Sequence, residues 1–195
     1  IRRLNSGDRA FVREAFELYR AALGRGLLLE NGVLTPFTYK NILRLGLALG
    51  ETVWARQFLD EQKRFLPARE RENTGRYNLA FFYFQQKNYA EAMPLLQKTD
   101  LDDVLNNLDA RRMLLRIYVE LGEQQALESL LDAFEIYLRR QKDIGYGREN
   151  YLKLIHFVKK WQSLPAEDTV ARARLRRQIV AATSVADREW LLEKI

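Results

Sequence analysis

The chain contains a pattern of residues that nearly repeats itself three times, and this repetition limits the possible folds more than any other feature. In each copy an apolar pair precedes a turn, and apolar or small residues follow the turn at helical spacing. The turns begin at residues 50, 87 and 122, which are 37 and 35 positions apart. A period of this length is typical of stacked helix pairs, because one pair alone cannot bury its apolar face. The sequence therefore predicts an all-α architecture.

The middle copy is the most complete of the three. The corresponding positions, copy by copy, are Ile42-Leu43, Gly50-Glu51, Ala55 and Leu59; Leu79-Ala80, Tyr83, Lys87-Asn88, Tyr89, Ala92 and Leu96; and Leu114-Leu115, Tyr118, Gly122-Glu123, Leu127 and Leu131. Small residues such as Ala55, Ala80 and Ala92 are expected to let neighbouring helices approach closely, because a large side chain there would overpack the contact. No stretch of alternating apolar and polar residues reaches the length of a strand.

These positions resemble the signature of the tetratricopeptide repeat family. Tyr39, Gly50, Ala55 and Pro67 match that signature around the first turn, whereas Gly46 stands where an aromatic residue is usual. The resemblance implies a right-handed superhelix of helix pairs, with a repeat-like core over 8–142 and a basic C-terminal cap over 148–194, as one domain spanning 1–195. The chain is also similar to the C-terminal part of larger bacterial helical-repeat proteins, a resemblance that implies no function.

Helical periodicity, capping residues and the positions of Gly and Pro predict the individual helices. The predicted helices cover about 8–23, 36–49, 51–65, 69–86, 89–97, 102–121, 123–141, 148–164, 167–183 and 187–194. The first is expected to present an apolar stripe of Phe11, Ala15, Leu18 and Ala22, which Phe16, Tyr19 and Leu23 widen at helical spacing. As the second half of an incomplete pair, it would expose this stripe, and the chain could then form a homodimer through it.

Composition narrows the function without assigning one. The chain has no Cys and one His, so it has no thiolate metal site and no cysteine nucleophile. No apolar run approaches the roughly 20 residues of a membrane-spanning helix, and no membrane partner is expected. No catalytic constellation stands out, so the sequence predicts a protein that is not an enzyme and has no cofactor. The compartment stays open, with the cytoplasm as the default.

The family resemblance also implies where a partner would bind. In the tetratricopeptide family the first helix of each pair lines a concave face. When the repeats are aligned, the residues of this chain that correspond to the concave face form the predicted partner-binding set: Lys40, Arg44, Tyr77, Asn78, Phe81, Arg112 and Arg116. Asn41, Phe84, Asp109 and Met113 would lie beside this set. Two basic clusters would flank an aromatic and amide patch, an arrangement that suits an acidic peptide or protein segment. The alternative is that the aromatic rings pack inward and the cations are only solvated.

A second candidate surface lies in the C-terminal third of the chain. Residues 138–180 contain eleven Lys or Arg against four Asp or Glu, whereas residues 1–137 balance at 19 against 19. Lys153 and Lys160 share one helical stripe, and Arg172 and Arg176 share another. Such clustering predicts nucleic-acid binding through phosphate charge as an alternative function. A solvated face with cations near helix ends is the simpler interpretation.

Overall fold

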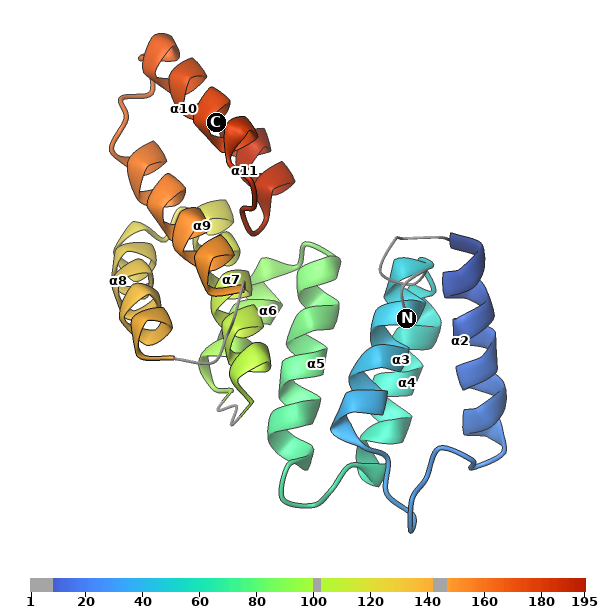
Figure 1. Ribbon diagram of the computed structural model, residues 1–195. Helices are drawn as coiled ribbons and strands as arrows, with labels where there is room; N and C mark the ends of the chain where they lie inside the picture. The colour runs from blue at the N-terminus through green and yellow to red at the C-terminus, as the bar shows by residue number, and fades with distance from the viewer. Residues whose placement is uncertain (1–8, 100–102, 142–146) are drawn as a thin grey trace. The chain divides into compact units, whose positions relative to one another are not determined.

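The computed structural model describes residues 9–99, 103–141 and 147–195 of the 195-residue chain. The described residues are almost entirely helical, and the only β pairing among them is an isolated bridge between Glu30 and Val33 (Figure 1). The helices are α2 (Arg9–Gly24), α3 (Pro36–Ala48), α4 (Thr52–Gln62), the 3-10 turn η1 (Lys63–Phe65), α5 (Arg71–Gln85), α6 (Tyr89–Gln97), α7 (Val104–Leu121), α8 (Gln124–Arg140), α9 (Gly147–Gln162), α10 (Thr169–Ala181) and α11 (Arg188–Lys194). The all-α prediction is confirmed.

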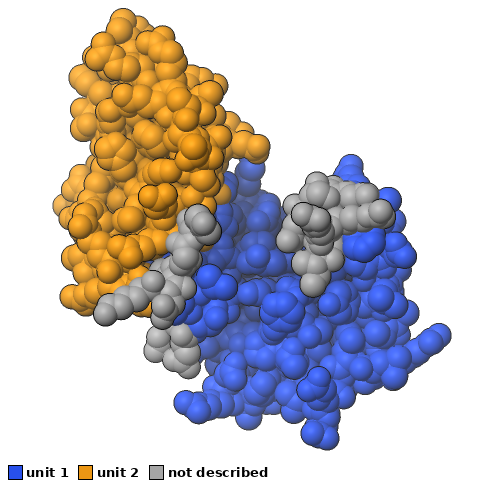
Figure 2. Space-filling model, in the orientation of Figure 1, with its two compact units in different colours: residues 1–121 blue, residues 122–195 orange. Residues whose placement is uncertain are grey.

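The chain divides into two compact units, Ile1–Leu121 and Gly122–Ile195 (Figure 2). We refer to them as unit 1 and unit 2. Unit 1 holds the first two of the three predicted turns and every residue of the predicted peptide-binding set. Unit 2 holds every residue of the predicted nucleic-acid set.

The three predicted turns share one backbone geometry. Gly50, Lys87 and Gly122 all adopt the left-handed conformation, with φ of 79°, 57° and 71°. In the first turn the N–H of Gly50 donates to Leu47 O (3.0 Å) and the N–H of Glu51 donates to Gly46 O (2.9 Å). These two hydrogen bonds define the Schellman motif, which satisfies the last carbonyls of a helix.

The second turn has the same two hydrogen bonds, but a residue with a side chain occupies the position of positive φ. The N–H of Lys87 donates to Phe84 O (3.0 Å) and the N–H of Asn88 donates to Tyr83 O (2.9 Å). Lys87 carries a Cβ, which the left-handed region disfavours, whereas Gly fits there without strain. The turns predicted from the sequence therefore do end helices, and the backbone of the turn at Lys87 is strained.

Unit 1 is organised around α5, which contacts α3, α4, α6 and α7. Small residues stand at the helix contacts, where Ala55, Ala80 and Ala92 are completely buried, as predicted. The Tyr39 ring is also completely buried, and its hydroxyl donates to Leu59 O at 3.0 Å. Burial, followed by the negative charge of Asp60, raises the pKa of Tyr39 far above its usual range, so this hydroxyl stays a donor.

Gly46 explains the departure from the repeat signature in α3. A Cβ at this position would lie 3.2 Å from the Phe16 ring of α2 and 3.2 Å from the Trp54 ring of α4. Those two rings meet edge to face, with their centroids 4.7 Å apart. The aromatic group that the signature places on this helix is thus replaced by rings from two neighbouring helices, which need a residue without a side chain between them.

The structure buries most of the apolar residues predicted for the first helix, but not Leu18. Phe16 is completely buried and Leu18 is 71% exposed, whereas the others are partly buried: Phe11, Ala15, Tyr19, Ala22 and Leu23. Val12, which the prediction did not include, is also buried. Phe16 is buried because its ring packs against Gly46 and Trp54. Self-association through this helix stays a prediction, with Leu18 as its exposed apolar residue.

Unit 2 is a chain of helices in sequential contact: α8 with α9, α9 with α10 and α10 with α11. Its core contains four buried residues from α8, four from α9 and two each from α10 and α11: Leu127, Leu131, Phe134, Leu138, Leu154, Ile155, Phe157, Val158, Leu175, Ile179, Trp190 and Leu191. The Lys159 ammonium also joins α9 to α8, because it contacts Asp132 at 2.7 Å and Glu135 at 3.0 Å.

Candidate functional site

The predicted peptide-binding residues lie on three helices of unit 1. Helix α5 contacts both α3 and α7, so side chains from the three helices can meet over α5. Thr35 caps α3 by accepting a hydrogen bond from the Thr38 N–H, and Pro36 occupies the first turn. The Asp103 carboxylate accepts the Asn106 N–H at the start of α7 (2.7 Å). These capping hydrogen bonds stabilise the first turns of α3 and α7. They thereby help to set the position of the polar side chains along each helix.

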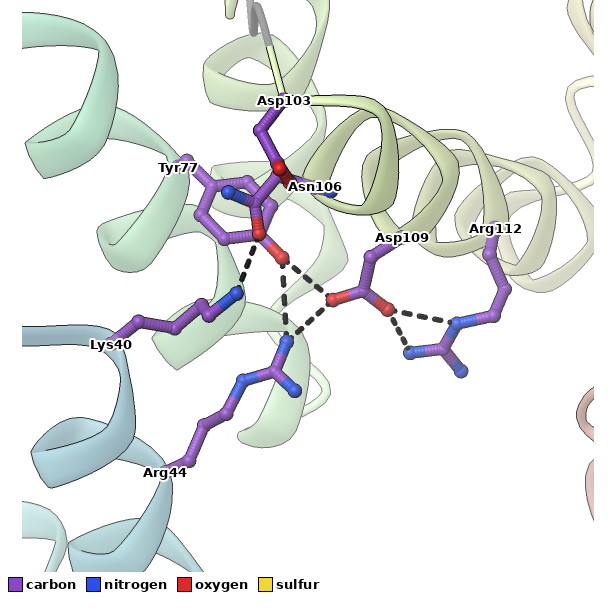
Figure 3. A network of polar contacts seen from close by, with 7 residues as sticks. All are labelled: Lys40, Arg44, Tyr77, Asp103, Asn106, Asp109 and Arg112. Atoms are coloured by element: carbon purple, nitrogen blue, oxygen red, sulfur yellow. Dashed lines mark hydrogen bonds and ion pairs between the residues drawn. The ribbon is translucent and has the colours of Figure 1, made fainter. Parts of the chain in front are cut away.

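Asp109 is the centre of a polar network that joins the three helices (Figure 3). One of its oxygens, Oδ2, accepts Arg44 Nη2 of α3 at 2.7 Å and the Tyr77 hydroxyl of α5 at 2.6 Å. The other, Oδ1, accepts Arg112 Nε at 3.0 Å and Arg112 Nη2 at 2.7 Å. The carboxylate is thus held by two guanidinium groups and one phenol through charge-assisted hydrogen bonds, which are stronger than those between neutral groups.

The network changes the acidity of its members. Burial opposes ionisation of Asp109, but the charge of Arg112, the hydrogen bond from Tyr77 and the charge of Arg44 together lower its pKa below the usual range. Burial, followed by the Asp109 charge and the hydrogen bond to it, raises the pKa of Tyr77 far above normal. Asp109 is therefore an anion and Tyr77 a neutral donor throughout the physiological pH range.

Lys40 lies beside this network and donates to a neutral group. Its Nζ donates to Asn106 Oδ1 at 2.7 Å (Figure 3). Burial and, next, the charge of Arg44 lower the pKa of Lys40, and the opposing effects of Asp103 and Asp109 do not cancel this shift. Burial is thus the main reason that the Lys40 ammonium is less basic than that of a free lysine side chain.

Two arginine side chains cover aromatic rings of α5. The Arg44 guanidinium lies 4.8 Å from the centroid of the Phe81 ring, and the Arg116 guanidinium lies 4.9 Å from that of Phe84. Both distances are within the range of cation–π attraction. The rings therefore form a buried floor and the cations form the outer layer, so a partner reaches the arginine groups before it reaches the rings.

The structure divides the predicted peptide-binding set into two layers. Tyr77, Asn78 and Phe81 are buried, with 2%, 1% and 7% exposure. Lys40, Arg44, Arg112 and Arg116 are partly exposed above them. Met113, which the register placed beside this set, is completely buried. Sequence reasoning did place Asp109 on this face, but it missed its role at the centre and missed Asn106, because an i,i+3 or i,i+4 pattern shows neighbours along one helix only.

Asn78 is an incompletely paired polar group in this floor. Its Nδ2 donates to Thr74 O at 2.8 Å, one turn earlier in α5, and its Oδ1 is buried without a hydrogen-bond partner. A buried unpaired acceptor costs free energy. Asn78 thus contributes a destabilising group to the layer below the cations.

The network does not line the hollow that borders α5 on another face. That hollow has a volume of about 290 Å³, and Lys63 and Glu72 at its edge are paired with each other at 3.0 Å. Its lining residues are Tyr39, Leu59, Asp60, Lys63, Glu72, Gly75, Arg76, Leu79 and Leu95. The candidate site is therefore a polar surface rather than this hollow.

The described residues contain neither a metal-binding cluster nor a membrane-spanning helix. In 9–99, 103–141 and 147–195, no three His, Cys, Asp or Glu side chains are grouped so that they could bind a metal ion. Over the same ranges, no helix combines the length and apolar character that crossing a bilayer requires.

The four residues of the predicted nucleic-acid set lie on two faces of unit 2. Lys153 Nζ donates to Thr183 Oγ1 at 3.3 Å, and Lys160 Nζ donates to Gln178 Oε1 at 2.7 Å. Arg176 instead donates to the carbonyl of Leu192 in α11, and Arg172 donates to Pro165 O at 3.4 Å. The two lysines thus face the α9–α10 contact, and the two arginines bind backbone carbonyl groups.

Comparisons with known proteins do not assign this site. No protein-family model, no curated protein sequence and no solved structure matches the chain.

Proposed function

We propose that unit 1 is a non-catalytic interaction module whose α3–α5–α7 face binds an acidic segment of a partner protein or peptide. The observation that carries this proposal is the gathering of four cationic side chains on this face. Lys40, Arg44 and Arg112 meet around the Asp109 carboxylate and the neutral Asn106 amide, and Arg116 lies over the buried Phe84 ring. Burial, followed by the charge of Arg44, lowers the pKa of Lys40, and an incoming carboxylate would favour the charged form of this lysine.

The arrangement around Asp109 supports the same chemistry. Arg44 and Arg112 already bind one carboxylate with short, charge-assisted hydrogen bonds, which shows that their side chains are held in a geometry suited to this group. Asp109 also fixes both arginines before a partner arrives, so less conformational entropy would be lost on binding. We propose that Lys40 and Arg116 supply most of the new contacts, because Arg44 and Arg112 already bind Asp109.

We further propose that the helix pairs of unit 1 form a right-handed superhelix like that of tetratricopeptide repeats. Two matching Schellman turns, at Gly50 and Lys87, support this proposal. Contacts of α5 with both α3 and α7 support it as well, because first helices of successive pairs are neighbours in such a stack.

The binding proposal is tested with a library of short synthetic peptides in which each Glu-containing member has a Gln counterpart. We expect the protein to retain Glu peptides about tenfold better, a difference of about 1.4 kcal/mol. The double variant Lys40→Glu/Arg116→Glu should lose this preference. It is a better choice than a change at Arg112, which would unpair the buried Asp109.

The matched control is Arg25→Glu/Arg69→Glu. Both of these arginines are exposed residues of unit 1 outside the face, so the control makes the same change in net charge. It should keep the preference for Glu peptides. Equal retention of Glu and Gln peptides by the unmodified protein, or an equal loss in both double variants, would refute the proposed function.

A further inference from the structure

A second charged surface lies in unit 2, between α9 and α10. Two contacts set the register of these helices: Lys153 meets Thr183, and Lys160 meets Gln178. Residue numbers rise along α9 as they fall along α10, so the helices are antiparallel. Lys153 and Lys160 are seven residues apart, which places their Cα atoms about 10 Å apart along α9.

Helix α10 adds two further cations to this surface. Its sequence from Thr169 to Ala181 contains four Arg and no Asp or Glu. Arg174 lies one turn before Gln178 and shares its stripe, which faces Lys160. Arg177 lies three residues after Arg174, so the two are neighbours on the surface of α10, and both are exposed. We name Lys153, Lys160, Arg174 and Arg177 the α9–α10 ridge.

The charges of the ridge are much less compensated than those on the other side of α9. There, Lys159 contacts two carboxylates, Asp132 and Glu135. On the ridge, Lys160 meets a neutral amide, and Lys153 meets a hydroxyl and, at 4.0 Å, the exposed Glu149. Among the residues that the structure describes, Glu149 is thus the one carboxylate in contact with these four cations, and it is at the limit of an ion pair.

We propose that the α9–α10 ridge binds the phosphate backbone of a nucleic-acid duplex without reading its sequence. The side chains present are those that contact phosphates in general: Arg and Lys, with the Gln178 amide and the Thr183 hydroxyl beside them. A ridge about 10 Å long spans about three phosphate-to-phosphate intervals of one strand, and so about four phosphates, since each strand carries one charge per about 3.4 Å of helix axis.

The composition of the ridge favours a duplex over other anionic partners. Single-strand sites stack bases on aromatic side chains, and the ring that stands between the ridge lysines is that of His156, which packs edge to face on Phe157. A membrane-binding helix needs a free apolar face, but Leu175 and Ile179 of α10 are both buried. A protein interface would need a buried aromatic or apolar anchor, which the ridge does not present.

The test is fluorescence anisotropy of the full chain with a labelled DNA duplex of mixed sequence, from about 50 to 200 mM salt. Four phosphate contacts predict a slope of log K against log salt of about −3 to −4. The variant Arg174→Gln/Arg177→Gln should bind at least about tenfold more weakly at the lowest salt, with a slope reduced by about 2. The matched control Arg25→Gln/Arg69→Gln removes the same charge from exposed positions of unit 1 and should bind as the unmodified protein does.

Three results would overturn the proposal. The first is no binding to the duplex at the lowest salt. The second is an equal loss in the ridge variant and in the control, which would show that net charge alone is responsible. The third is stronger or equal competition, per negative charge, by poly-glutamate, by phosphatidylserine vesicles or by a single strand, which would assign the ridge to that partner instead. Circular dichroism of both variants verifies that neither change alters the helical content.

Discussion

The role of Asp109 leads to a quantitative prediction about the stability of unit 1. This carboxylate joins α3, α5 and α7 through four hydrogen bonds, and its side chain is 15% exposed. Asp109→Ala removes the acceptor and leaves Arg44, Arg112 and the Tyr77 hydroxyl without it. The perturbation is therefore confined to one polar network and creates no large apolar cavity.

The expected loss follows from how easily each former partner regains water. Tyr77 is almost fully buried, so its unpaired hydroxyl costs about 1–3 kcal/mol. Arg112 is mostly buried, whereas Arg44 is 40% exposed and can turn to solvent. Breaking a fully buried ion pair costs about 3–5 kcal/mol, and the exposure of Arg44 reduces this figure. We expect Asp109→Ala to lower the free energy of unfolding by about 3 kcal/mol.

The assay is urea unfolding followed by circular dichroism, with two reference variants. Tyr77→Phe should cost about 1 kcal/mol, and its effect should not add fully to that of Asp109→Ala, because the two side chains share a hydrogen bond. Asp60→Ala breaks an exposed pair with Arg56 at i,i+4 and should cost only about 0.3–0.5 kcal/mol.

The stability difference between the unmodified protein and Asp109→Ala should depend on pH if its origin is electrostatic. The folded protein lowers the pKa of Asp109, so the stabilisation is complete above the ordinary pKa of about 3.9 and disappears as the pH falls through the lowered value. The gap between the unmodified protein and Asp109→Ala should be constant from about pH 5 to 8 and shrink below about pH 4. A cost below about 1 kcal/mol, or a gap unchanged at low pH, would refute this account.

Three further variants test the packing and the turns of unit 1. Gly46→Leu should destabilise the protein by about 2–3 kcal/mol in urea unfolding, because the new Cβ alone would lie 3.2 Å from the rings of Phe16 and Trp54. An unchanged free energy of unfolding would show that this contact is not tight. Lys87→Gly should raise the free energy of unfolding by about 0.5–1 kcal/mol, because Gly adopts the left-handed conformation without strain, and Gly50→Lys should lower it by a similar amount. Changes of the opposite sign would contradict the inferred strain at this turn.

Much of the secondary structure could be predicted from the sequence, since the signals that set it are local. Gly50 and Gly122 end helices because Gly adopts positive φ without a steric cost, and the 35–37 residue spacing revealed Lys87 as the equivalent stop. Pro36 after the capping Thr35 marked the start of α3. Such signals act within a few residues, so no knowledge of the packing was needed to find them.

The register of the helices against one another was harder to predict. The sequence offered two overlapping apolar stripes on the first helix, and the structure buries Phe16 rather than Leu18. The choice depends on the space above Gly46, which the Trp54 ring of a third helix also fills. A pattern along one helix carries no information on the shape of its neighbours.

The charged surfaces, too, depend partly on local sequence and partly on tertiary packing. The sequence determined that the chain is helical, where its helices end and that its basic surplus lies in the C-terminal third. Only the tertiary structure decided that Asp109 accepts Arg44 from 65 residues away, and that Lys153 and Lys160 meet neutral groups while Lys159 meets two carboxylates. Helix formation depends on hydrogen bonds between residues four apart, whereas the pairing of a charge depends on which helices the apolar core brings together.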